Sequence, residues 1–211
     1  PAYVDELSVI MASGFDYMQR EGDAGGSVYL RLSTRTIAQV KRDMSPALSQ
    51  DILNGAYWLE APNARTEAVI AYTGAIAPEA QSAVEALKAL GIATALLAIT
   101  STDKLYADWS AAERARRQGK DTANCHIETL LEALPAHCRI VTVLDGHPAP
   151  LAWLGSVEGH KTTALGVERF GESAGLEDLY RAHGIDAAAI VSAVEAHAGT
   201  RRAEPSRKRA S

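Results

Sequence analysis

The chain lacks the features that mark several large classes of protein. Its 211 residues include only two cysteines, Cys125 and Cys138, and the longest apolar run, residues 92–99, is interrupted by a threonine. Two cysteines cannot form a disulfide scaffold, so we expect a reducing, cytoplasmic setting. The apolar run is far too short to cross a bilayer, and no charged-then-apolar segment opens the chain, so no membrane partner is expected.

The sequence also lacks the common nucleotide-binding motifs. No G-x-G-x-x-G follows a predicted strand, and no G-x-x-x-x-G-K-[ST] is present. Residues 199–211 carry five basic side chains and one acidic one, a local charge of +4, which leaves −9 for the rest of a chain with net charge −5. An acidic body does not favour nucleic acid as a partner, and the basic, polar tail is expected to be disordered.

Two cysteine–histidine pairs, Cys125-His126 and His137-Cys138, raise the question of a metal site. The residues between them, 127–134, have the pattern of a helix. A rise of about 1.5 Å per residue then separates the pairs by roughly 12 Å, too far for four ligands on one ion. We therefore expect no metal site and interpret both cysteines as partly buried thiols.

The segment Gly171-Glu172-Ser173-Ala174-Gly175 matches the G-x-S-x-G motif of serine hydrolases. That motif needs an acid and a histidine on later loops, each after a further strand. Only residues 176–211 remain, and their pattern indicates two helices and a tail without another strand. We therefore interpret Ser173 as a turn residue that helps to start a helix.

Hydrophobic periodicity predicts a small N-terminal unit ahead of an α/β domain. Residues 4–20 are predicted as an amphipathic helix, 27–33 as a strand, and 34–54 as a linker with a short helix. Beyond them, apolar strands alternate with helices, which indicates a mostly parallel sheet covered on both faces. The predicted strands are 57–60, 68–72, 92–99, 139–144 and 161–167, and the predicted helices are 78–90, 102–117, 127–134, 148–157, 176–183 and 186–197.

The expected fold class is therefore α/β, as a three-layer α/β/α domain with a five-stranded, mostly parallel sheet. This domain is predicted at residues 51–198. A helix-strand remnant of an upstream domain and a linker are predicted at 1–50, and the disordered basic tail at 199–211. The chain begins with Pro1 rather than methionine, so we expect a longer natural protein.

Several stretches resemble enzymes of the transketolase superfamily. Residues 1–29 resemble the end of the pyrimidine-binding domain in the homodimeric decarboxylating component of pyruvate dehydrogenase, through PAY at the start, VIM at 9–11, Gly14 and Val28-Tyr29. Residues 54–59 (NGAYWL) are similar to the strand that opens its C-terminal domain, and Ile99-Thr100-Ser101 with Leu105 and Glu113-Arg114 to a later segment. Residues 166–184 (GVERFGESAGLEDLYRAHG) are similar to the end of the C-terminal domain of transketolase itself.

The resemblance implies a parent enzyme that uses thiamine diphosphate and Mg²⁺, built from diphosphate-binding, pyrimidine-binding and C-terminal domains. The family's Gly-Asp-Gly and Asn-Asn motif is absent: Asp145-Gly146 has no glycine before it, and the three asparagines are never adjacent. The resemblance therefore implies a C-terminal fragment that binds no cofactor by itself and has a structural and subunit-interface role. The alternatives are the C-terminal part of a transketolase, or a stand-alone non-catalytic α/β dimerisation module.

The resemblance also places candidate functional residues. In transketolases a Ser-Arg pair binds the sugar phosphate, and Ser33-Thr34-Arg35 takes its place here with one residue more. Arg35 is therefore expected to bind a substrate anion, since a guanidinium forks onto phosphate or carboxylate. A solvated linker arginine is the alternative. A homodimer is expected, with the acyltransferase component of a 2-oxo acid dehydrogenase complex as a further partner. The candidate loop and interface residues are Asp145, His147, Arg169, Phe170 and Glu172. A helix-start role for His147 and a core position for Phe170 are the alternatives.

Overall fold

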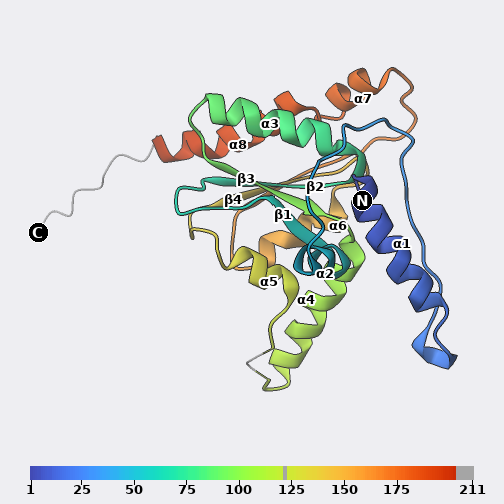
Figure 1. Ribbon diagram of the computed structural model, residues 1–211. Helices are drawn as coiled ribbons and strands as arrows, with labels where there is room; N and C mark the ends of the chain where they lie inside the picture. The colour runs from blue at the N-terminus through green and yellow to red at the C-terminus, as the bar shows by residue number, and fades with distance from the viewer. Residues whose placement is uncertain (121–122, 203–211) are drawn as a thin grey trace, which may run out of the picture.

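The computed structural model describes residues 1–120 and 123–202 of the chain. A five-stranded sheet in the order β1-β3-β2-β4-β5 lies between two layers of helices (Figure 1). Four strands are parallel, and β1 joins the edge antiparallel to β3. This confirms the predicted three-layer α/β fold. The strands are β1 (Ala56–Glu60), β2 (Ala68–Thr73), β3 (Thr94–Ile99), β4 (Arg139–Val143) and β5 (Thr162–Leu165).

The central strands are mostly apolar because helices cover both faces of the sheet. Five of the six residues of β2 are buried, and so are the last five of β3. On one face lie α3 (Ala77–Ala89) and α8 (Ala187–Arg202), and on the other α4 (Thr102–Arg117), α5 (His126–Leu131) and α6 (Ala149–Ala152) (Figure 1). Two separate hydrophobic cores result, one for each face.

The remaining elements connect these layers. They are α1 (Val4–Met18), α2 (Pro46–Asn54) and α7 (Leu176–Ala182), with short 3-10 turns η1 (Gly22–Ala24), η2 (Gly74–Ile76) and η3 (Trp153–Ser156). The sequence pattern of α3 shows why it docks where it does. Ala80, Ala83, Val84 and Leu87 are all buried and recur at the helical spacing of three or four residues, so they form one apolar stripe against the sheet.

Three predicted segments differ from the structure. Residues 27–33 are not a strand; they line the groove at the carboxyl ends of the strands. The predicted helix at 148–157 divides into α6 and η3. The last helix continues to Arg202, into the predicted tail, because its alanine-rich sequence has a high helix propensity; residues 203–211 lie outside the described part of the chain.

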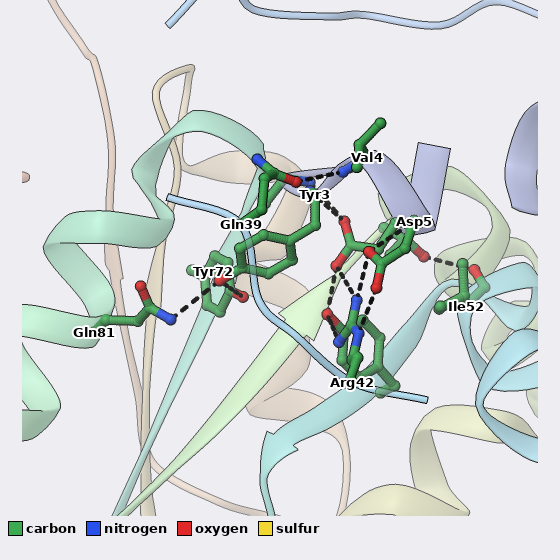
Figure 2. A network of polar contacts seen from close by, with 12 residues as sticks. Tyr3, Val4, Asp5, Gln39, Arg42, Ile52, Tyr72 and Gln81 are labelled. Atoms are coloured by element: carbon green, nitrogen blue, oxygen red, sulfur yellow. Dashed lines mark hydrogen bonds and ion pairs between the residues drawn. The ribbon is translucent and has the colours of Figure 1, made fainter. Parts of the chain in front are cut away.

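A buried polar network fastens α1 to the sheet (Figure 2). The Glu6 side chain is only 1% exposed and accepts hydrogen bonds from the backbone N–H groups of Ala2 and Tyr3, at 2.6 and 3.1 Å. The Tyr57 hydroxyl of β1 donates a further hydrogen bond to the same carboxylate. These bonds satisfy a buried carboxylate that would otherwise be costly to bury.

Arg42 completes this network from the linker side. Its guanidinium donates to Asp5 at 2.7 and 2.9 Å and to the Tyr57 hydroxyl at 2.7 Å, and it lies over the rings of Tyr3 and Tyr57. Burial alone would raise the pKa of Asp5, but the hydrogen bonds from Arg42 and from backbone N–H groups outweigh it and lower the pKa. One side chain thus joins α1, the linker and β1.

Among the described residues, no helix is long and apolar enough to cross a membrane.

Candidate functional site

The carboxyl ends of β2, β3 and β4 open onto a groove whose other wall consists of α1 and residues 27–34. The groove has a volume of about 1270 Å³. Ligands of open α/β sheets generally bind at this edge, where loops from several strands converge. This groove is therefore the main candidate site in the described part of the chain.

The loop after β4 contributes Asp145 and His147 to the groove. The Arg31 guanidinium contacts Asp145 twice, with Nη2 at 3.2 Å from the backbone oxygen and Nη1 at 3.6 Å from Oδ1. His147 is exposed, and its Nδ1 accepts a hydrogen bond of 3.2 Å from the Ala149 backbone N–H at the start of α6. This bond agrees with the alternative helix-start interpretation, and a role of His147 at a subunit interface stays a prediction.

The loop after β5 packs directly against the loop after β4. The Val167 backbone N–H donates to the Gly146 oxygen at 2.8 Å. A Cβ at position 166 would lie 2.5 Å from the Gly146 oxygen and 2.8 Å from Pro148, so only glycine allows this close approach. The loops after β4 and β5 thus contact each other at the carboxyl edge of the sheet.

Arg35 is not free in the structure. Its Nη1 and Nη2 atoms each lie 2.7 Å from a different carboxylate oxygen of Glu79, and Nη1 also donates to the Ala75 oxygen at 2.7 Å. The guanidinium lies over the Tyr180 ring, 5.3 Å from its centroid. The bond to Glu79 raises the pKa of Arg35 above its ordinary value. A substrate anion would have to compete with Glu79, and substrate binding by Arg35 stays a prediction.

Arg169, Phe170 and Glu172 lie together on the surface of the loop before α7. Arg169 donates to the Ala182 oxygen at 2.8 Å and pairs with Glu172 at 3.3 Å. Glu172 also lies 3.5 Å from Nε2 of His183. The Phe170 side chain is fully exposed and contributes nothing to either hydrophobic core. The expected charged–apolar–charged patch is present, and the core alternative for Phe170 is wrong.

The structure excludes the serine hydrolase interpretation. Strand β5 ends at Leu165 and α7 begins at Leu176, so Ser173 lies in a ten-residue loop rather than on a sharp strand-to-helix turn. Ser173 is exposed, and the N-cap of α7 is Gly175. The predicted role of Ser173 in starting the helix is therefore also wrong.

The two cysteine–histidine pairs make separate contacts. His126 places its Nε2 2.7 Å from the Ala56 oxygen, and burial raises the pKa of Cys125 to about 12. Cys138 is buried, and burial raises its pKa to about 11. Within residues 1–120 and 123–202, no group of three or more His, Cys, Asp or Glu side chains has an arrangement that could hold a metal ion.

A family model described as the transketolase-like TK C-terminal domain matches residues 55–186. The chain belongs to the transketolase C-terminal domain family. The match begins at Gly55, directly before β1, and ends at Asp186, directly before α8, so it contains all five strands. The groove thus lies between this transketolase C-terminal domain and the N-terminal segment that precedes it.

Solved transketolases have a similar fold. A transketolase variant from Pichia stipitis matches with a TM-score of 0.52 and 16% identity, over 74% of this chain and 20% of its own. A transketolase from Leishmania mexicana matches with a TM-score of 0.51 and 19% identity, over 72% of this chain and 19% of its own. The chain therefore spans about a fifth of the length of these enzymes, and the likeness concerns the fold alone. No protein with a curated description matches the sequence.

The sequence patterns missed the polar residues that join the N-terminal segment to the transketolase C-terminal domain. These residues contact partners that are distant in the sequence: Arg31 contacts Asp145, Arg42 contacts Asp5, and Glu6 contacts Tyr57. The two residues of each pair are at least 37 positions apart. A glutamate in the first turn of a helix ordinarily faces solvent, so nothing local marks Glu6 as buried. The one available signal was the three arginines at 31, 35 and 42 in a segment of little regular structure.

Proposed function

We propose that this chain is the C-terminal region of a thiamine diphosphate-dependent enzyme, with a structural and subunit-interface role. The observation that carries the proposal is the family match across residues 55–186, together with the five-stranded sheet that those residues form. Relatives with this domain are enzymes several times longer than this chain. The remaining catalytic parts would belong to other regions of the parent protein.

The residues present do not fit the cofactor. The sequence has neither a Gly-Asp-Gly motif nor adjacent asparagines for a diphosphate-bound Mg²⁺. Asp145, which precedes Gly146 at the groove, already forms an ion pair with Arg31. A divalent ion with diphosphate needs several oxygen ligands gathered around it, and no three His, Cys, Asp or Glu side chains of the described residues are grouped in this way. We therefore assign no catalytic step to this chain.

For the parent reaction we propose decarboxylation of a 2-oxo acid, as in the pyruvate dehydrogenase component. The support is the resemblance of residues 1–29 and 54–59 to that enzyme. Residues 55–59 form the turn into the edge strand and most of the strand itself, so the resemblance coincides with a structural element. An acyltransferase component would then be a partner. The alternative is ketol transfer between sugar phosphates, favoured by the solved transketolases that share the fold.

The assay of the complete product of the parent gene distinguishes these reactions. With thiamine diphosphate and Mg²⁺ added, reduction of ferricyanide that depends on pyruvate supports the proposed decarboxylation of a 2-oxo acid. Transfer of a two-carbon unit between sugar phosphates supports the transketolase alternative. If the folded protein shows neither activity, the non-catalytic dimerisation module is the remaining candidate.

Calorimetry on the chain itself tests its lack of a cofactor site. We expect no heat of binding when thiamine diphosphate is titrated into the chain in the presence of Mg²⁺. Micromolar affinity would contradict the proposal that the catalytic apparatus lies elsewhere.

A further inference from the structure

The loop between β5 and α7, residues 166–175, is attached to the rest of the domain chiefly through side chains. Its first attachment is the hydrogen bond from the Val167 backbone N–H to the Gly146 oxygen. Among the described residues, no backbone–backbone hydrogen bond involves residues 168–174. Side-chain contacts therefore decide how firmly this part of the loop is held.

Three side chains connect the loop to the end of α7. Arg169 donates a hydrogen bond to the Ala182 backbone oxygen at 2.8 Å, and its Nη2 lies 3.3 Å from Oε1 of Glu172. Oε2 of the same carboxylate lies 3.5 Å from Nε2 of His183. Glu172 thus lies between a permanent cation and a group that carries a positive charge only when it is protonated.

His183 is the buried member of this group. Its side chain is 7% exposed, whereas those of Arg169 and Glu172 are 64% and 36% exposed. Glu168 and Glu177 are exposed to solvent. Other charged or titratable side chains on or beside α7 have partners of their own: Asp178 with Arg181, Glu79 and Tyr180 with Arg35, Asp145 with Arg31, and Asp186 with the Ala189 backbone N–H. Within the described residues, the carboxylate that a protonated His183 contacts is therefore that of Glu172.

Protonation changes the strength of the contact between Glu172 and His183. Histidine is the side chain whose charge ordinarily changes between about pH 5 and pH 8. A protonated imidazole forms a charge-assisted hydrogen bond with a carboxylate, roughly twice as strong as a neutral one. His183 is also the C-cap of α7, and a positive charge at this end of a helix is favoured by the helix dipole. The contact should therefore tighten as the pH falls through this range.

We propose that Arg169, Glu172 and His183 form a pH-sensitive clasp, which holds residues 168–174 against the end of α7 when His183 is protonated and loosens as the pH rises. The Arg169 contacts with Glu172 and the Ala182 oxygen persist at every pH in this range, so the neutral clasp is weaker rather than absent. The clasp fixes the chain on both sides of Phe170, since Arg169 and Glu172 flank that residue.

Spin-label mobility tests the clasp in the whole chain. A single nitroxide is placed on Phe170→Cys, an exposed position, and the native thiols of Cys125 and Cys138 are buried and stay unlabelled. The electron paramagnetic resonance spectrum should contain an immobile and a mobile component. The immobile-to-mobile ratio should fall about 1.4- to 5-fold from about pH 6 to pH 8, the range for one ion pair near the surface. Because the label replaces the Phe170 ring, the result does not depend on the proposed homodimer.

Two variants of the labelled chain assign the pH dependence to the clasp. His183→Gln and Glu172→Gln should each remove it, because neither retains a carboxylate opposite a histidine. Glu172→Gln changes a partly exposed side chain, so it keeps the test decisive if His183→Gln disturbs the fold. His137→Gln is the matched control, because it removes an exposed histidine before β4 and should leave the full pH dependence.

Three results would overturn the clasp. The first is an immobile-to-mobile ratio that stays constant between the two pH values in the labelled chain. The second is a pH dependence that survives in Glu172→Gln. The third is a change in mobility that appears only together with loss of the circular dichroism signal, which would show global unfolding.

Discussion

Arg35 and Glu79 form a two-pronged ion pair across the junction between the N-terminal segment and α3. Each Nη atom of Arg35 lies 2.7 Å from its own carboxylate oxygen of Glu79. Both side chains are mostly buried, and the Tyr180 ring covers the guanidinium. This geometry matches the fork of a guanidinium to the two oxygens of a carboxylate, which lysine cannot reproduce.

The Arg35–Glu79 pair should therefore be visible as a coupling energy. Arg35→Ala and Glu79→Ala should each lower the free energy of unfolding by about 1–3 kcal/mol, because each leaves a partly buried charge without its partner. The double variant should lose less unfolding free energy than the sum of the losses in the two single variants. Urea unfolding of all four proteins measures the coupling, with Arg35→Lys as the charge-conserving control. A coupling near zero would mean that the pair is solvated and that Arg35 remains free to bind a substrate anion.

Arg42→Ala should have a larger effect than Arg35→Ala. It removes the hydrogen bonds to Asp5 and Tyr57, and it removes the guanidinium that lies 3.6 Å from the Glu6 carboxylate, which is 1% exposed. Breaking one partner of a buried charged network costs about 3–5 kcal/mol. Urea unfolding at neutral pH measures the loss. Arg31→Ala, which removes an exposed arginine from the same segment, is the control and should cost less than about 1 kcal/mol.

The Arg42 effect should also depend on pH. The pKa of Asp5 in the folded protein is below its ordinary value, so Asp5 stabilises the fold above its unfolded pKa of about 3.9 and loses that contribution as the pH falls further. Arg42→Ala removes the main hydrogen-bonding cause of this shift. The difference in unfolding free energy between the unmodified chain and Arg42→Ala should thus narrow in acid. If the difference in unfolding free energy stays constant below a pH of about 3.9, Asp5 is not coupled to Arg42.

Cys125 and Cys138 should be unreactive until the chain unfolds. Burial raises their pKa values to about 12 and about 11, so almost no thiolate forms near neutral pH. A coloured disulfide reagent should modify both thiols in urea and neither in the native protein. A cysteine introduced at the exposed Tyr29 should react at once and serves as the control. Rapid native labelling of either native cysteine would contradict the buried positions.

Ser173→Ala should change neither chemistry nor stability. The serine is exposed, and Gly175 rather than Ser173 occupies the N-cap position of the helix that follows, so the free energy of unfolding should stay within about 0.5 kcal/mol. A fluorophosphonate probe should not label the unmodified chain. Stoichiometric labelling that disappears in Ser173→Ala would restore the hydrolase hypothesis.

Phe170 offers a test of the proposed homodimer. Its fully exposed ring lies between Arg169 and Glu172, an arrangement suited to a contact in which the same surface serves both partners. Light scattering at tens of micromolar should show a dimer for the unmodified chain and a shift towards monomer for Phe170→Ser. Leu90→Ser removes another exposed apolar side chain, at the end of α3, and should leave the dimer intact. A monomer in all three proteins would remove this interface.

The layered α/β fold of this chain could be predicted from its sequence alone. A strand covered on both faces is mostly apolar, and a helix on such a sheet is apolar on one stripe, so local patterns identify β2, β3 and α3.

The roles of the charged residues and of residues 27–33 depend on the tertiary structure. Residues 27–33 have an alternating pattern, yet they form no strand and line the groove instead. The sequence indicates a free anion-binding residue at Arg35, whereas in the structure Arg35 is paired with Glu79 of α3. Likewise, Glu6 has the pattern of a surface carboxylate, but Tyr57 and Arg42 enclose it. Backbone periodicity is a property of neighbouring residues, whereas the partner of a charge is set by which distant elements pack together.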